Sequence, residues 1–125
     1  MFKEFIIVGI GSFFGGGMRL LVSRGMQAIA ILPFPFGTFL VNITGCLLFG
    51  FISGLPSNGA YLSPTTKLLL TTGFCGGFTT FSTFMGESAI LMRGNSFTHL
   101  VFYLSASLVI GMLAMLAGHW AAKMV

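Results

Sequence analysis

The sequence predicts an all-α integral membrane protein with four transmembrane helices, of which the third is broken at its centre. The 125 residues are 55% hydrophobic and only 6% charged, whereas a soluble domain usually carries about a quarter charged residues. The apolar residues fall into four runs separated by proline-containing or polar connections. The third run collects glycines and hydroxyl side chains at its centre, where they weaken a regular helix.

The four predicted spans form a single membrane domain over residues 1–125. They run over about residues 5–23, 36–55, 66–92 and 97–122. Residues 25–35 are expected to form a short connection, because Pro33 and Pro35 disfavour helical backbone. Residues 56–64 (PSNGAYLSP) have the composition of a polar loop.

The first span contains an arginine close to or inside the membrane interface. Only 14 uncharged residues separate Glu4 from Arg19, which is short for a complete span. An ionisable group at that depth is costly and is a candidate for function. The alternative is that Arg19 extends toward the headgroups. Gly11 and Gly15 form a small-xxx-small pair that lets another helix approach closely.

The second span carries a polar residue well inside its apolar sequence. Thr38, Asn42 and Gly45 share one face of the helix. The Asn42 amide needs a partner at this depth, so it either hydrogen-bonds another helix or contacts a permeating solute. Gly50 and Gly54 supply a second pair for close helix packing.

The third span has the strongest functional signal of the chain. Its uncharged run covers residues 68–86, with three glycines within five positions, followed by four hydroxyls within five positions: Thr79, Thr80, Ser82 and Thr83. Irregular backbone at membrane depth is tolerated only where it is buried in protein or lines a water-filled cavity. Broken helices bind ions there through exposed backbone groups. The pattern therefore predicts an ion site.

Aromatic and polar side chains in the third and fourth spans are further candidates for function. Phe81 and Phe84 are three residues apart, so on a helix after the break they point to nearly the same side; such a pair serves either packing or function. In the fourth span, Tyr103 and Ser107 are one turn apart and Gly111 continues their face. A polar stripe on an apolar span must face protein or water.

Composition and spacing argue against several other function classes. The net charge of +4 comes from six scattered basic residues, without the basic patch that nucleic-acid binding requires. His99 and His119 are 20 residues apart and cannot share a metal ion. Cys46 and Cys75 lie in apolar runs and are expected to be buried hydrophobic residues. No nucleophile–base pair is recognisable, so we do not expect an enzyme.

The charges also bear on orientation in the membrane. With four spans, Lys3, Lys67 and Lys123 fall on one side, and Arg19, Arg24 and Arg93 fall on the other. The positive-inside rule depends on an asymmetry of Lys and Arg, and here three oppose three. We therefore expect insertion in both orientations, with two antiparallel copies packed about a two-fold axis in the membrane plane.

The same topology brings Arg19 and Glu87 near one membrane surface. An unpaired charge at that depth is expensive. We hypothesise that the two side chains form an ion pair.

Three sequence blocks resemble the Fluc (CrcB-like) family of fluoride channels. The most specific is the run over residues 71–84 (TTGFCGGFTTFSTF), which is followed by Glu87. Residues 16–19 (GGMR) agree in the first span, and residues 35–38 (PFGT) with Asn42 agree in the second. The resemblance extends over the whole chain in length and in the order of the segments.

This resemblance implies a dual-topology antiparallel homodimer in the cytoplasmic membrane of a bacterium, with two pathways for passive fluoride export. It implies a structural sodium ion at the dimer centre, held by the backbone carbonyls of Gly76 and Thr79 from both subunits. It also implies the pathway residues Asn42, Phe81, Phe84, Thr83, Tyr103 and Ser107, and it matches Arg19 to the arginine of the family's first segment.

Two other readings compete with the channel. A small dual-topology, proton-coupled cation or multidrug exporter would need a carboxylate embedded in the first helix, and the only acidic residue there is Glu4 at its end. A structural subunit of a larger membrane complex would explain the glycines. It would not explain why hydroxyls and phenylalanines cluster at one helix break.

Overall fold

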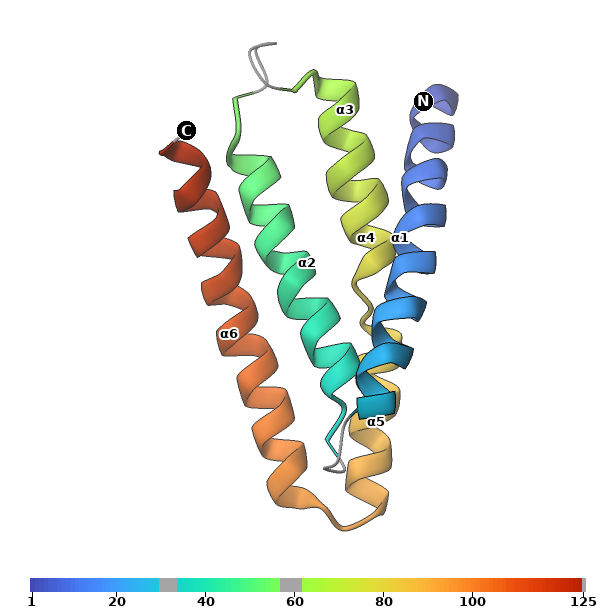
Figure 1. Cartoon of the computed structure of the whole chain (residues 1–125), viewed down its shortest axis with the longest axis vertical. Helices are drawn as coiled ribbons and strands as arrows, with labels where there is room; N and C mark the ends of the chain where they lie inside the picture. The colour runs from blue at the N-terminus through green and yellow to red at the C-terminus, as the bar shows by residue number, and fades with distance from the viewer. Residues whose placement is uncertain (30–33, 57–61, 125) are drawn as a thin grey trace.

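The described residues form three continuous helices and one interrupted segment (Figure 1). The computed structural model describes residues 1–29, 34–56 and 62–124. The continuous helices are α1 (Phe2–Ile29), α2 (Phe36–Gly54) and α6 (Phe97–Lys123). The interrupted segment consists of α3 (Pro64–Leu68), the π-helix η1 (Leu69–Cys75), α4 (Gly76–Phe78) and α5 (Ser82–Arg93).

In the described part of the chain, α1, α2 and α6 are long and apolar enough to cross a membrane. The third segment is not one such helix, because α4 ends at Phe78 and Thr79 has extended backbone (ψ 161°). The predicted break in the third helix is therefore confirmed, and it occupies residues 79–81. The four predicted segments agree with the structure in order and type.

Two local features differ from the sequence expectation. The connection predicted for residues 25–35 is too long, since α1 continues to Ile29. Residues 25–29 contain no proline, and the first residue that breaks the helix pattern is Pro33. The sequence reasoning also missed η1. There the Gly76 N–H bonds to the carbonyl of Thr71, five residues back, as well as to that of Gly73, which is the bonding of a π-helix.

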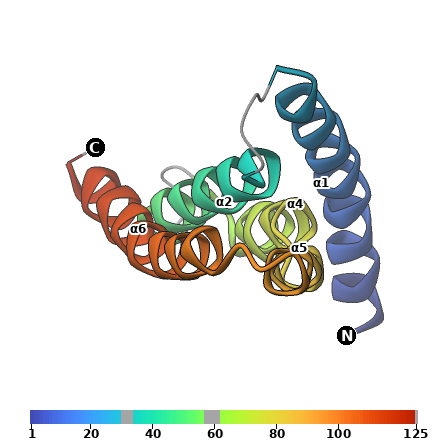
Figure 2. The same cartoon turned by 90° about the horizontal axis from the view of Figure 1, so that it is seen from below.

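The helices form a curved row when the molecule is seen along its length (Figure 2). From one side to the other, the order is α6, α2, the third segment and α1. Gly11 and Gly15 of α1 let its backbone touch that of η1 and α4; a β-carbon at Gly15 would overlap the Phe74 carbonyl. Gly50 of α2 and Gly118 of α6 allow a similar approach on the other side. Gly54 likewise lies against the His119 carbonyl of α6. The expected roles of the glycine pairs in the first and second spans are thus confirmed.

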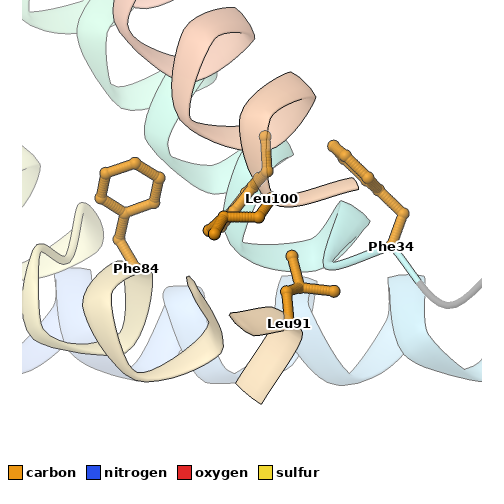
Figure 3. Packing of buried hydrophobic residues seen from close by; sticks show 5 residues of the cluster. Phe34, Phe84, Leu91 and Leu100 are labelled. Carbon is orange, nitrogen blue, oxygen red and sulfur yellow. The ribbon is translucent and has the colours of Figure 1, made fainter. Parts of the chain in front are cut away.

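A hydrophobic cluster lies at one end of the molecule, where α5, α6 and the start of α2 meet. Its buried members are Phe34, Phe84, Leu91, Leu100 and Tyr103. Figure 3 shows Phe84 and Phe34 on opposite sides of this cluster, with Leu100 and Leu91 between them. The cluster holds α5 against α6 just beyond the helix break.

Both chain termini lie at the other end of the molecule (Figure 1). Lys3 begins α1, Lys67 lies in α3 and Lys123 ends α6, so the three lysines gather at that end. Arg24 and Arg93 lie near the opposite end. Four membrane segments, as expected from the sequence, place both termini and these three lysines at the same end.

Candidate functional site

The site is built around the backbone of the break, which Asn42 of α2 holds with two hydrogen bonds. The Asn42 Nδ2 donates to the Thr80 carbonyl over 3.1 Å, and the Thr80 N–H donates to Asn42 Oδ1 over 2.8 Å. The backbone of one residue is thus satisfied in both directions by a single side chain. Asn42 was expected to bond either another membrane segment or a solute. The structure shows the first of these, because its partner Thr80 belongs to the interrupted third segment. An amide NH₂ has two protons, and the contact with Thr80 uses one.

Thr80 in turn caps the helix that follows. Its side-chain oxygen accepts a hydrogen bond from the N–H of Thr83 over 3.2 Å, which satisfies a backbone donor in the first turn of α5. The Thr79 hydroxyl donates to the Cys75 carbonyl over 2.9 Å. The hydroxyls predicted to compete for backbone hydrogen bonds therefore do so on both sides of the break.

These side-chain contacts divert the usual donors of two carbonyl groups. In a continuous helix, the Gly76 carbonyl would accept from the Thr80 N–H, and the Thr79 carbonyl would accept from the Thr83 N–H. The Thr80 N–H donates to Asn42 instead, and the Thr83 N–H donates to Thr80 Oγ1. Gly76 and Thr79 are the two residues whose carbonyls the family resemblance matched to a sodium site.

Arg19 contacts the other side of the break. Its Nε donates to the Gly77 carbonyl over 3.1 Å, where the end of α4 leaves backbone carbonyls without helical partners. A cation is also favourable at a helix C-terminus, although a helix of only three residues limits this effect. Arg19 therefore lies at the depth of the break rather than extending to the interface.

The hypothesised ion pair between Arg19 and Glu87 does not form within the described chain. Glu87 accepts a hydrogen bond from the Tyr103 hydroxyl over 3.4 Å, while Arg19 is engaged with Gly77. The one ion pair among the described residues joins the N-terminal amine and Glu4. The freed Gly77 carbonyl satisfies the arginine in place of a carboxylate.

Residues predicted for an ion pathway come together in one pocket of about 280 Å³ beside the break. Four of them, Asn42, Phe81, Phe84 and Ser107, contribute to its wall, although they come from three different segments. The remaining lining residues are Cys46, Thr79, Thr80 and Leu108. The pocket is lined by amide, hydroxyl, sulfur and aromatic groups, with no charged side chain among them.

The two phenylalanines have different surroundings within this pocket. Their ring centroids are 6.2 Å apart, so the expectation that they share a side holds. Phe84 is 7% exposed and packs edge-on against Tyr103, with centroids 4.9 Å apart, whereas Phe81 is 72% exposed. Phe81 precedes α5 at its N-cap position, and this places its ring at the open side of the pocket.

The hydroxyl of Ser107 is buried without a hydrogen-bond partner in the described part of the chain. Buried hydroxyls are normally satisfied, and leaving one unpaired costs free energy. Because Ser107 also lines the pocket, its hydroxyl is available to a polar occupant. Tyr103, one turn away on α6, is fully buried behind Phe84. Thr83 is exposed and does not line the pocket.

A second pocket, of about 290 Å³, lies on another side of the break. It is lined by Gly76 and Thr79 together with Gly45, Cys46, Phe49, Thr71, Thr72, Cys75 and Met115. Gly76 and Thr72 are exposed on this side. Its oxygen donors are backbone carbonyls and threonine hydroxyls, which suit a hard monovalent cation such as Na⁺. Within the described ranges, no group of His, Cys, Asp and Glu could hold a metal ion.

Sequence reasoning missed two residues that shape the site. The Ser12 hydroxyl donates to the Gly73 carbonyl over 3.2 Å and so joins α1 to η1. Phe34 packs against Tyr103, with ring centroids 5.4 Å apart. The placement of Phe34 between two prolines is a signal that could have indicated a fixed direction for its ring.

Comparison with known proteins identifies the family of the chain. The family model described as "CrcB-like protein, Camphor Resistance (CrcB)" matches residues 6–119. The chain belongs to the CrcB-like family. This assignment covers all four membrane segments, including the break and both pockets.

Individual relatives are similar over nearly their whole length. The chain is 43% identical to the "Fluoride-specific ion channel FluC" of Chlorobium phaeobacteroides strain BS1 over 98% of this chain and 95% of that protein. It is 44% identical to the protein of the same name in Chlorobaculum tepidum, over 98% and 96% respectively. With the Bacteroides fragilis protein of strain ATCC 25285, also named "Fluoride-specific ion channel FluC", it shares 44% identity over 93% of each chain.

Together with the apolar helices, this family membership makes the chain a multi-pass membrane protein of a bacterial family. The family is one of ion channels rather than of enzymes. The expectations for family, fold class and membrane location are confirmed.

The contact between Arg19 and the break predicts a difference between two arginines of one helix. Arg19→Ala leaves the Gly77 carbonyl unpaired and should lower the free energy of unfolding by about 1.5–3 kcal/mol, the usual value of a hydrogen bond to a charged group. Arg24→Ala removes the same charge from an exposed site on α1 and should have little effect. Thermal unfolding of the purified proteins in detergent measures both.

Equal melting temperatures for the two variants would contradict this role of Arg19. Exchanging Arg19 and Glu87 should give no recovery over the single variants, since the partners of both side chains lie elsewhere.

Proposed function

We propose that this protein is a fluoride channel that lets fluoride leave the cytoplasm passively and so relieves its toxicity. The observation that carries the proposal is the pocket beside the break, where Asn42, Phe81, Phe84 and Ser107 converge from separate segments. The names of the bacterial relatives, whose similarity covers at least 93% of this chain, point to the same ion.

The chemistry of the pocket suits a small, strongly hydrated anion. Fluoride accepts hydrogen bonds strongly, so a pathway must replace its water with donors. The second Nδ2 proton of Asn42 and the unpaired hydroxyl of Ser107 are donors of this kind. Phenylalanine rings have a positive edge, so Phe81 and Phe84 can hold an anion without a full charge. An ion site in a channel must bind well enough to be entered and weakly enough to be left.

The polar track would continue from this pocket along α6 and α5. Tyr103 lies directly behind Phe84 and carries a hydroxyl that now donates to Glu87. Thr83 is exposed on the first turn of α5, where it can contribute a hydroxyl toward a second subunit or the aqueous mouth. Glu87 would then mark the vestibule at this end of the pathway.

We further propose an antiparallel homodimer inserted in both orientations. One chain leaves Phe81 and the side of the break that carries Gly76 exposed, and polar backbone at membrane depth must be covered by protein. The lysines and arginines give little orientation bias: three lysines lie at one end, and Arg24 and Arg93 lie at the other. Arg19 lies in the interior, so the balance is three against two, which is a weak asymmetry.

A sodium ion at the centre of this dimer would be coordinated by backbone carbonyl oxygens of the break. The Gly76 and Thr79 carbonyls have lost their helical donors to side-chain contacts. Four such carbonyls, two from each subunit, would supply the oxygen ligands that unwound helices provide for Na⁺ in other membrane proteins. When bound, the ion supplies positive potential at the dimer centre and links the two subunits.

The exporter reading gains no support from the position of the acidic residue on α1. Glu4 has an exposed side chain and lies 3.6 Å from the N-terminal amine, far from the break. A carboxylate that exchanges protons for cations has to lie inside the membrane.

Ser107 provides the sharpest test of the pathway, because its hydroxyl makes no hydrogen bond in the described chain. Ser107→Ala should leave the melting temperature unchanged or raise it, since an unsatisfied buried group is removed. If the hydroxyl serves fluoride, efflux should slow by about tenfold, the value of one hydrogen bond of roughly 1.4 kcal/mol. Ser105→Ala, an exposed serine on the same helix, is the matched control.

Fluoride and chloride efflux from liposomes, read by ion-selective electrodes, is the measurement. The unmodified protein should release fluoride and retain chloride, and Asn42→Ala, Phe81→Ala and Phe84→Ala should be impaired. Absence of fluoride efflux from a correctly assembled protein would overturn the proposed function. Unchanged efflux in Ser107→Ala would remove Ser107 from the pathway.

The dual topology predicts labelling from both sides of the membrane. In a Cys46→Ser and Cys75→Ser background, single cysteines are placed at opposite ends of the molecule by Pro56→Cys and by Gly94→Cys. A membrane-impermeant thiol reagent applied outside the cell should label about half of each population if both orientations are inserted. Complete labelling of one cysteine with none of the other would establish a single orientation and refute the antiparallel arrangement.

The sodium site predicts a stability that depends on the cation present. A ligand at a hundredfold excess over its Kd adds about 2.7 kcal/mol to the folded state. The melting temperature of the purified dimer should therefore rise with Na⁺ and fall when N-methyl-D-glucamine replaces it at constant ionic strength. A melting curve that does not respond to Na⁺ would argue against the site, whether or not the protein conducts fluoride.

A further inference from the structure

Phe34 is held in a fixed direction by the turn that starts α2. The N–H of Phe36 donates to the Phe34 carbonyl over 2.8 Å, and Pro35 between them has φ −77° and ψ 69°. These values are those of an inverse γ-turn. Proline suits its central position because the ring already fixes φ near this value. The turn reverses the chain sharply and leaves the Phe34 ring buried among the side chains of α5 and α6.

The buried ring of Phe34 forms one wall of the space around Tyr103. Phe34 meets Tyr103 nearly perpendicularly, with ring centroids 5.4 Å apart and an interplanar angle of 84°. Phe84 meets Tyr103 at 4.9 Å and 65°. The Tyr103 side chain, which is fully buried, is therefore held by two ring contacts. Figure 3 shows Phe34 and Phe84 on opposite sides of the cluster to which Tyr103 belongs.

The two rings that contact Tyr103 line different pockets. Phe84 lines the pocket that contains Asn42 and Ser107. Phe34 lines a different pocket, of about 200 Å³, whose wall also includes Glu87. The Tyr103 hydroxyl donates to Glu87 over 3.4 Å, which is a long hydrogen bond. The Tyr103 side chain therefore combines this long hydrogen bond with ring contacts on two sides.

We propose that Phe34 is a positioning residue of the anion pathway, which holds the Tyr103 hydroxyl between the Phe84 pocket and the Glu87 pocket. Edge-to-face packing favours one ring orientation over others, so the two phenylalanines fix the direction in which the phenol donates. Without the Phe34 ring, Tyr103 can rotate into the vacated space, and its hydroxyl is lost from the pathway. The inference rests on the proposed function, since it concerns how one hydrogen-bond donor of that pathway is held in place.

The experiment compares fluoride efflux from liposomes for a set of matched variants. Phe34→Leu keeps an apolar side chain but removes the ring, and it should slow efflux by about tenfold, as the loss of one oriented donor would. Phe97→Leu is the matched control, because Phe97 is an exposed phenylalanine of the same helix as Tyr103. It makes no ring contact with Phe34 or Tyr103 in the described chain. Its efflux should stay within about twofold of the unmodified protein.

A double-mutant cycle with Tyr103→Phe separates positioning from general packing. If Phe34 acts through the Tyr103 hydroxyl, Phe34→Leu should slow the unmodified protein but cause no further loss in the Tyr103→Phe background. A purely structural role would lower the melting temperature and slow both backgrounds equally. Phe34→Met serves as a second ringless variant and replaces Phe34→Leu if the latter does not assemble.

The outcomes distinguish this inference from the proposed function. No fluoride efflux from the unmodified protein defeats the function itself. If the unmodified protein releases fluoride, two results defeat the positioning role alone. One is an equal efflux rate in Phe34→Leu, and the other is a fully additive loss in the double variant. A large loss in the single variant that disappears in the Tyr103→Phe background supports it.

Discussion

The structure depends on satisfying the backbone of a helix that is interrupted inside an apolar segment. Each backbone N–H or C=O left unpaired in such surroundings costs free energy, so the break persists only if other groups replace the lost helical bonds. Asn42 replaces two of them at Thr80, and Arg19 provides a donor for Gly77. The break is therefore a joint product of α1, α2 and the third segment.

This requirement explains the packing of the rest of the chain. Side chains reach the break only if the neighbouring helices come close, and Gly11 and Gly15 allow the backbone of α1 to touch η1 and α4. At this close approach the Ser12 hydroxyl of α1 donates to the Gly73 carbonyl of η1. On the other side, Gly50 and Gly118 allow α6 to pack closely against α2. Ser107 of α6 then lines the same pocket as Asn42 of α2.

Much of this arrangement was predictable, because the relevant signals are local in the sequence. Glycines and hydroxyls concentrated within one apolar run predict a broken span, and an asparagine in an apolar helix predicts a polar contact. The partners were less accessible. Arg19 was paired with Glu87 because charges attract, but the nearest group in need of a donor was a backbone carbonyl. The π-helix has no reliable signal in the sequence, and the direction of Phe34 depends on a turn formed by Pro35.

The same constraint accounts for the absence of charged side chains from the lining of the pocket beside the break. The cation that lies deepest, Arg19, is committed to the Gly77 carbonyl, and the nearest carboxylate, Glu87, accepts from Tyr103. What remains for a solute is a set of dipoles and ring edges held by a fixed backbone. Such groups attract an anion more weakly than a free guanidinium would, and weak attraction is what passage requires. The interactions that stabilise the break thus also set how tightly an ion can be held beside it.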